Sequence, residues 1–185
     1  IWNDITYTVS FDLNGGTGTA PEALTVKESE ASTPLPDGTG MTSPTGKVFG
    51  GWNTAAAGDG TAYAAGDTIS DVTANISLYA IWSDAVYTIS FNINEGTGTA
   101  PGSINVLHGQ DSAALPGVDG MTAPAHKYFT GWNTAADGKG TTFGTGGKIS
   151  NVTNDITLYA IWNDITYTVS FDLNGGTGTA PEALT

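Results

Sequence analysis

The feature that most constrains this chain is a repeat with a fixed period of 80 residues. Residues 1–80 align with residues 81–160 without an insertion or deletion, and about half of the positions are identical. The last 25 residues, 161–185, match residues 1–25 at every position but match residues 81–105 at only about half. We therefore expect copies of one small module in an array that alternates between two module types.

The module boundaries are predicted where one strand pattern follows another with almost nothing between them. The expected divisions are the end of a preceding module in residues 1–4, module 1 in residues 5–82, module 2 in residues 85–162, and the opening hairpin of a third module in residues 165–185. A two-residue linker cannot act as a flexible tether, so neighbouring modules are expected to hold a limited range of angles. Because the chain opens in the middle of the pattern, we expect it to belong to a longer protein.

The residue pattern within a module predicts several short strands. Residues 7–13 alternate strictly between apolar and polar side chains, which is typical of a half-buried strand. Asn14-Gly15-Gly16 follows and supplies the positive φ angles of a tight turn, so a second strand at residues 23–27 is expected to complete a hairpin. A third strand is predicted at residues 47–53, where the glycine pair allows either a close approach of backbones or a bulge before Trp52. A central strand, apolar on both faces, is predicted at residues 75–82.

The middle of each module is expected to hold at most a short helix or helical turn. Residues 28–41 and 108–121 are rich in proline, glycine and serine, which do not sustain a long helix. The two modules also differ most from each other in these segments.

Three sequence blocks carry a resemblance to a known family. They are Val9-Ser10-Phe11-Asp12-Leu13-Asn14-Gly15-Gly16, Phe49-Gly50-Gly51-Trp52-Asn53-Thr54 and Leu78-Tyr79-Ala80-Ile81-Trp82, and the second module repeats them at matching spacing. The chain resembles the Listeria-Bacteroides repeat family, and is similar to the B repeats of internalin B. The resemblance implies tandem β-grasp-like (ubiquitin-like) modules in exported surface proteins, and it transfers no catalytic residue. The predicted class is therefore β-rich α+β with little or no helix, although the long middle segment and Glu95 in the turn depart from the family pattern.

The charge balance argues against several classes of partner. The chain has 18 acidic residues, five lysines and no arginine, for a net charge of -13. A nucleic acid or an anionic membrane surface would be repelled, and no apolar run approaches the roughly 20 residues that span a bilayer. We expect no nucleic acid and no membrane insertion. The absence of cysteine removes thiolate catalysis and cysteine-based metal sites, and no cofactor is expected.

The residues that could carry chemistry do not recur between the modules. Both histidines, His108 and His126, lie in module 2. The equivalent positions of module 1 hold Glu28 and Gly46, so we interpret the histidines as solvated loop residues. Calcium would suit acidic residues near glycines, of which there are four: Asp37, Asp59, Asp119 and Asp137. Because the two modules place these acids at different positions, ordinary turns are the favoured interpretation. Lysines do recur beside the third strand, at Lys47 and Lys127; an isopeptide cross-link is one interpretation and an exposed strand residue the other.

Aromatic residues at equal positions are the candidates for interaction. Tyr79 and Ile81 point opposite to Leu78 and Trp82, so they are a possible interaction surface together with Tyr159 and Ile161. Trp2, Trp82 and Trp162 are candidates for packing between modules. The tryptophans could also form a platform for sugar rings, but core packing is the preferred interpretation.

The expected function is that of a non-catalytic extracellular repeat array, serving as a stalk, a spacer or a fibre-forming segment of a bacterial surface adhesin. The alternative is an adhesive module that binds a host protein or glycan with avidity from repetition. Expected partners are neighbouring modules, other copies of the chain in a fibre, and a host protein or glycan. The expected location is extracellular, on the cell surface or secreted. An enzyme is the weakest hypothesis, because no acid, base or nucleophile recurs or clusters.

The partial third module raises a separate expectation. A lone hairpin is marginally stable in water, and Phe171 would have no core of its own to join. We therefore expect residues 165–185 to be covered by another chain or by the continuation of an array.

Overall fold

The computed structural model describes residues 4–184, and these residues contain strands, turns and irregular segments but no helix. They form two compact units, of which the first extends to Val86 and includes Leu107–Gly109. The class is therefore all-β, and the α+β part of the sequence prediction is wrong. The middle segments cross the sheet as irregular chain because their prolines and glycines do not support even one helical turn.

Each module is built from seven strands. In module 1 they are β1 (Thr6–Asp12), β2 (Thr17–Gly18), β3 (Leu24–Lys27), β4 (Met41–Thr42), β5 (Lys47–Asn53), β6 (Ala62–Tyr63) and β7 (Ile76–Asp84). In module 2 they are β8 (Val86–Asn92), β9 (Thr97–Gly98), β10 (Ile104–Leu107), β11 (Met121–Thr122), β12 (Lys127–Asn133), β13 (Thr142–Phe143) and β14 (Ile156–Asp164). The four long strand patterns recognised in the sequence are confirmed within one or two residues, including β5 and β12.

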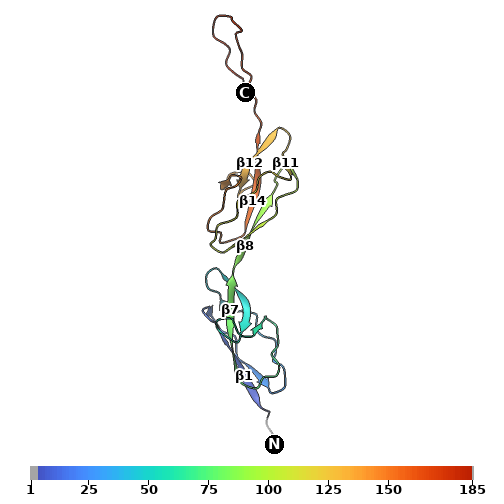
Figure 1. The fold of residues 1–185 in the computed structure, drawn as a ribbon, viewed down its shortest axis with the longest axis vertical. Coiled ribbons are helices and arrows are strands. Elements are labelled where there is room, and N and C mark those ends of the chain that lie inside the picture. Colours follow the sequence, from blue (N-terminus) through green and yellow to red (C-terminus); the bar gives the residue numbers. More distant parts are fainter. Residues whose placement is uncertain (1–3, 185) are drawn as a thin grey trace. The chain divides into compact units, whose positions relative to one another are not determined.

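The five-stranded sheet of module 1 has the order β3-β1-β7-β5-β6. β1 pairs antiparallel with β3 and parallel with β7, and β7 pairs antiparallel with β5. Of the two alternatives for the glycine pair, the bulge is present, because the register between β5 and β7 shifts between Phe49 and Gly51. Module 2 repeats the order as β10-β8-β14-β12-β13, with β8, β14 and β12 side by side (Figure 1). The last strand of each module is thus central, as its two apolar faces predicted.

The hairpin of β1 and β3 has a more elaborate connection than a tight turn. Asn14 and Gly15 adopt positive φ angles of 45° and 91°, as predicted. The chain then forms β2, which pairs with β4 in a separate two-stranded sheet, before it returns as β3. This second sheet attaches the middle segment to the hairpin, and module 2 repeats it with β9 and β11.

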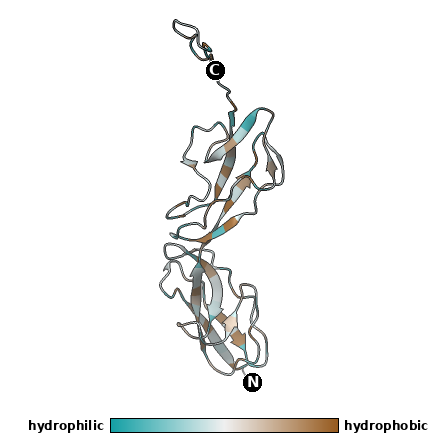
Figure 2. Ribbon diagram, turned by 45° about the horizontal axis from the view of Figure 1, so that its top comes forward, coloured by the Kyte–Doolittle hydropathy of each residue, from teal (hydrophilic) through white to brown (hydrophobic). Residues whose placement is uncertain are grey.

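The core of each module lies on one face of the sheet. Apolar residues recur along the strands of both sheets (Figure 2). In module 1 the buried apolar residues are Val9, Val26, Leu35, Trp52, Ile69, Val72, Leu78 and Ala80, and module 2 has a cluster of the same kind around Ile89, Trp132 and Leu158. Leu35, Ile69 and Val72 come from irregular segments, so these segments are the second layer that covers the sheet.

The irregular layer is held together by backbone and serine hydrogen bonds. In module 1 the N–H of Ser32 donates to the carbonyl oxygen of Ile69 at 2.8 Å, and the N–H of Ile69 donates to Oγ of Ser32 at 3.0 Å. The N–H of Leu35 donates to Asp67 and the N–H of Gly66 donates to Leu35, both at 2.8 Å. These bonds satisfy buried backbone groups that a helix would otherwise have satisfied.

Aromatic rings fill the end of each core near the β1–β2 turn. In module 1 the ring centroids of Phe11 and Trp52 are 4.7 Å apart, and Phe49 lies 5.1 Å from Trp52 and 5.8 Å from Trp82. The corresponding distances in module 2 are 4.7, 5.3 and 5.5 Å. The tilted and edge-on geometries are those that aromatic pairs prefer. In this cluster the backbone of Gly16 lies against the indole of Trp82 in module 1, and the backbone of Gly96 lies against the indole of Trp162 in module 2.

Residues 165–184 make almost no contact with a core. All of them are exposed except Ala180, which is half-buried. Val169 and Leu184 form an isolated antiparallel bridge, with backbone bonds of 2.8 and 3.0 Å. The large apolar side chains of this segment therefore face solvent in the single chain.

Replacing Gly96 by alanine tests the contact between turn and indole. A Cβ at Gly96 would lie 2.6 Å from Cζ2 of Trp162, whereas a Cβ at Gly102 of the same module would meet nothing within 4 Å. Neither glycine has a positive φ. We expect Gly96→Ala to destabilise module 2 by about 1–3 kcal/mol through overpacking. Amide hydrogen exchange of β8 and β14, measured by mass spectrometry, should be faster in Gly96→Ala; equal exchange in Gly96→Ala and Gly102→Ala would contradict the contact.

Candidate functional site

The residues predicted to form an interaction surface lie on the outer face of the central strand. In β7, Leu78 and Ala80 are buried against the core, while Tyr79 and Ile81 alternate with them and point to the opposite face. Tyr79 and Ile81 are half-buried, as are Tyr159 and Ile161 on β14. The two pairs therefore occupy the same face in their own modules, and part of their surface is accessible.

A loop after the third strand covers part of this face, and a buried asparagine organises it. Asn53 is 2 % exposed, and its Oδ1 accepts the N–H groups of Ala55 and Gly60 at 2.9 and 3.0 Å. Its Nδ2 donates to the carbonyl oxygen of Gly58 at 3.1 Å. A Cβ at Gly58 would lie 3.5 Å from Cδ1 of Ile81, so the loop rests on Ile81.

Module 2 builds the same loop around Asn133. This side chain is fully buried and accepts the N–H of Ala135 at 2.9 Å. It donates to the carbonyl oxygens of Gly138 and Gly140 at 3.1 and 3.2 Å, and to Oγ1 of Thr142 at 2.8 Å. The loop is thus a fixed part of each module.

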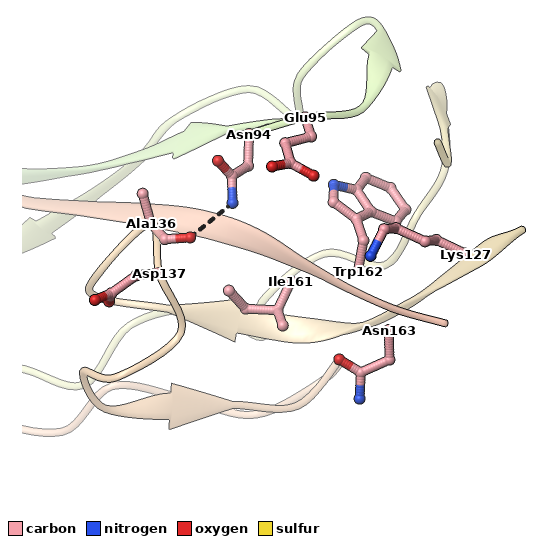
Figure 3. A pocket seen from close by; sticks show the side chains of 8 residues that line it. All are labelled: Asn94, Glu95, Lys127, Ala136, Asp137, Ile161, Trp162 and Asn163. Atoms are coloured by element: carbon pink, nitrogen blue, oxygen red, sulfur yellow. Dashed lines mark hydrogen bonds between the residues drawn. The ribbon is translucent and has the colours of Figure 1, made fainter. Parts of the chain in front are cut away.

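A second asparagine ties this loop to the first turn. Nδ2 of Asn14 donates to the carbonyl oxygens of Ala56 and Ala80, each at 2.9 Å. In module 2, Nδ2 of Asn94 donates to Ala136 at 2.9 Å, a bond drawn in Figure 3, and to Ala160 at 3.0 Å. The outer face of each central strand is therefore framed by the turn on one side and the loop on the other.

In module 2 this frame encloses a surface pocket of about 320 Å³. Its lining residues are Asn94, Glu95, Lys127, Ala136, Asp137, Ile161, Trp162 and Asn163 (Figure 3). At the positions of Glu95 and Asp137, module 1 has Gly15 and Ala57. The two carboxylates are therefore particular to module 2, where they line the pocket together with Lys127 and the apolar Ile161. Asp137 also lies 3.7 Å from Nζ of Lys139.

The recurring lysines form ion pairs at the ends of the central strands. Nζ of Lys47 lies 2.7 Å from Oδ1 of Asp84, and Nζ of Lys127 lies 3.0 Å from Oδ1 of Asp164. The lysine side chains are 38 % and 30 % exposed and their partners 58 % and 76 % exposed. This geometry is that of exposed strand lysines in surface ion pairs, which contribute little to stability. It favours the second of the two interpretations drawn from the sequence.

Two of the four acidic residues near glycines, Asp37 and Asp137, accept backbone hydrogen bonds from residues two positions further on. The hydroxyl of Thr39 and then its backbone N–H lower the pKa of Asp37, and that N–H lies 3.0 Å from Oδ1. Asp137 likewise accepts the N–H of Lys139 at 3.1 Å. Within residues 4–184 no three histidine, cysteine, aspartate or glutamate side chains come together as a metal site would require. His126 is exposed, and His108 is half-buried.

The tryptophans considered for packing between modules have partners within their own modules. Nε1 of Trp82 donates to the carbonyl oxygen of Leu13 at 2.9 Å, and Nε1 of Trp162 donates to Ile93 at 3.1 Å. Trp162 is 8 % exposed within the module 2 core. Trp2 lies outside the described residues. The proposed packing between modules stays a prediction.

Sequence reasoning did not single out the asparagines that frame the outer face. The sequence predicts only a turn at Asn14 and only the end of a strand at Asn53. Their recurrence as Asn94 and Asn133 was visible. However, the side-chain bonds from Asn14 to Ala80 span 66 residues, and no local pattern reports such a bond.

These features define a class of protein: tandem all-β repeat modules, each with its own five-stranded sheet in the same strand order and its own core. The Listeria-Bacteroides repeat domain matches the chain twice, at residues 7–81 and 87–161, and the chain belongs to this family. The resemblance drawn from the three blocks is thus confirmed. Members of this family are generally non-catalytic. No solved structure matches the chain.

Two relatives come from Evansella cellulosilytica. One, named "Putative Gly-rich membrane protein", is 33 % identical over 177 residues, which are 95 % of this chain and 19 % of the relative. The other, named "Putative membrane protein", is 32 % identical over 177 residues, which are 95 % of this chain and 24 % of the relative. The chain thus spans no more than a quarter of these relatives. Among residues 4–184, no helix is both long and apolar enough to cross a membrane.

Replacing Asn133 by alanine tests the frame of the outer face. The variant would leave buried N–H and carbonyl groups of the loop without partners, so we expect it to destabilise module 2 by about 2–4 kcal/mol. Asn154→Ala is the matched control, because Asn154 is exposed and donates only to its neighbour Asp155. Urea unfolding followed by circular dichroism should show the loss for Asn133→Ala alone; similar midpoints for both variants would contradict the role of Asn133.

Proposed function

We propose that this chain is a non-catalytic spacer in the extracellular part of a bacterial surface protein. The observation that carries the proposal is that each module has its own core and its own sheet, in the same strand order, with one residue between the last strand of module 1 and the first strand of module 2. Such modules add length to a protein one at a time.

The connection between modules supports limited flexibility. The pairing of β5 with β7 continues past Trp82 through Asp84, and the N–H of Ala85 then donates to the carbonyl oxygen of Gly46 at 2.8 Å. β8 begins at Val86. Because Ala85 is hydrogen-bonded and lies between two strands, it lacks the freedom of a glycine-rich or serine-rich linker.

The surface location is supported by the relatives and by the family. Both Evansella cellulosilytica relatives are named as membrane proteins and are four to five times longer than the matched region, as shares of 24 % and 19 % imply. The repeat family is associated with cell surfaces. A spacer between a membrane anchor and an outer domain is consistent with both facts. We propose the same setting, extracellular and attached to the cell or secreted, for this chain.

We also propose that the module is a variant of the β-grasp fold without its helix. The support is the mixed sheet with the first and last long strands parallel and adjacent at its centre, and a chain segment that crosses one face between the two halves of the sheet. In this chain irregular segments carrying Leu35 and Leu115 take the place of the helix.

The second candidate function is adhesion to a host glycan or protein. It is favoured by the pocket on the outer face of module 2, where Glu95 and Asp137 surround Ile161. Carboxylates accept hydrogen bonds from sugar hydroxyls, and repetition of the module would add avidity. Because module 1 lacks both carboxylates, only one of the two module types would bind.

Small-angle X-ray scattering of chains with increasing module number tests the spacer. We expect the maximum dimension to grow linearly by about 30 to 40 Å for each added module, because this is the size of a compact domain of such length. The maximum dimension should be independent of protein concentration. A maximum dimension that stays constant as modules are added would contradict the proposal.

Binding to an array of glycans separates the second candidate from the first. We expect no binding above background if the chain is only a spacer. Binding that is lost in Glu95→Gln/Asp137→Asn and kept in Asp59→Asn, an exposed acid of module 1, would instead establish adhesion through module 2.

A further inference from the structure

The two long strands that open and close each module are parallel neighbours. In module 2, β8 opens the module and β14 closes it, and they pair over four successive residue pairs that begin with Ile89 and Ile156. Because the two strands run in the same direction, the start of β8 and the end of β14 lie at opposite ends of the pair. A pull on the two ends of the module therefore slides one strand along the other.

Side-chain hydrogen bonds join the same two segments at both ends of the strand pair. At one end the N–H of Thr88 donates to Oδ1 of Asp155 at 2.8 Å. At the other end Nε1 of Trp162 donates to the carbonyl oxygen of Ile93 at 3.1 Å. Sliding of β8 along β14 stretches these bonds together with the backbone bonds of the pair.

Module 1 has the same arrangement. β1 and β7 pair in parallel over four residue pairs. The N–H of Thr8 donates to Oδ1 of Asn75 at 2.9 Å at one end, and Nε1 of Trp82 donates to the carbonyl oxygen of Leu13 at 2.9 Å at the other. The arrangement is therefore a property of the module and not of one copy.

The connection between the modules passes tension directly from one strand pair to the next. β7 ends at Asp84 and β8 begins at Val86, so only Ala85 lies between the last strand of one pair and the first strand of the other. A single residue has no slack that could absorb a pull along the chain. Tension along the array therefore acts on the parallel pair of every module that it crosses.

We propose that the parallel strand pair of each module is a mechanical clamp, which lets the array carry tension along the chain without unfolding. Under such a pull several hydrogen bonds must break together before the strands separate. A pull that opens the pair from one end breaks the same bonds one after another. Because forced unfolding depends on the unfolding rate and not on the equilibrium stability, the direction of the pull decides how much force the module resists.

The tension-bearing role rests on the proposed spacer function, because a spacer between a membrane anchor and an outer domain is pulled at both of its ends. The resistance of the strand pair to force can nevertheless be measured separately. A chain that fails to lengthen with module number in the scattering experiment contradicts the spacer alone. Equal resistance in two directions of pull contradicts the clamp alone.

The test pulls module 2 of the full chain in two directions with optical tweezers. The chain has no cysteine, so two introduced cysteines provide unique attachment points for handles. One cysteine is added after Thr185 in both variants. The other is Val86→Cys at the start of β8, which loads the pair in shear, or Glu95→Cys in the turn after β8, which opens the pair from one end. Both positions are exposed, and module 1 lies outside both loaded spans.

We expect the mean unfolding force at equal pulling speed to be at least about threefold higher for Val86→Cys than for Glu95→Cys, because the bonds act together only in shear. Both variants should release about 220–250 Å of extended chain, which shows that the same module unfolds in each. Val86→Cys/Glu95→Ser is the matched control, because it changes the turn but is pulled in shear. Its unfolding force should equal that of Val86→Cys.

Two further variants, made in the Val86→Cys chain, locate the resistance within module 2. Trp162→Phe removes an indole N–H whose bond to Ile93 is stretched by the pull. Trp132→Phe removes the same group from a bond of 2.8 Å to Pro116, which joins β12 to the irregular layer and lies outside the strand pair. We expect the larger loss of shear force in Trp162→Phe, although Trp132 is the more buried of the two.

Two results would overturn the proposal. Equal unfolding forces for Val86→Cys and Glu95→Cys would show that resistance follows from the stability of the module and not from the direction of the pull. A larger loss of shear force in Trp132→Phe than in Trp162→Phe would show that the core resists the force and the strand pair does not.

Discussion

The parallel pairing of the first and last long strands is the interaction on which each module depends. Val9 lies opposite Ile76 and Phe11 opposite Leu78, so strands from the two ends of the module meet at the centre of its sheet. Every other long strand is added to this pair, β3 to the side of β1 and β5 to the side of β7. Because the partners are 67 positions apart along the chain, the module forms only after a long loop has been closed. The hydrogen bonds from Asn14 to Ala80 and from Trp82 to Leu13 also join the first turn to the last strand, and so stabilise the paired strands.

Strand positions could be predicted from the sequence because each is reported by a local pattern. The alternation of residues 7–13 and the two apolar faces of residues 75–82 gave their strand type, and the latter also gave a central place in the sheet. The positive φ of Asn14 followed from residue type, whereas the glycine pair at Gly50 left a bulge and a close approach of backbones as alternatives. The absence of a helix was harder to predict, because residues 28–41 carry no periodicity, and their structure is set by long-range bonds such as Ser32 to Ile69.

The outer face could be predicted only in part. Strand alternation placed Tyr79 and Ile81 away from the core, which was the available signal. Their partial cover comes from a loop whose shape depends on buried Asn53, and an asparagine at the end of a strand is ordinarily read as the start of a turn. The lining of the module 2 pocket includes Glu95 and Asp137, two positions where the modules differ. A search for recurring residues therefore passes over it.

An array of such modules needs copies that share one strand order, but it also needs each module to pair with its own first strand and not with that of a neighbour. A module that is completed by its first 21 residues can be completed equally well by any identical segment, so identical neighbours would exchange strands during folding. In this chain adjacent modules are identical at only about half of their positions, and the identical segments 5–25 and 165–185 are separated by 160 residues. The substitutions include core side chains that would be exchanged: module 1 has Val9 where module 2 has Ile89, and both are fully buried. A segment from the other module type would therefore bring a side chain of different volume into a packed core. Alternation therefore lowers the affinity of each module for the segment next to it while preserving the shared strand order.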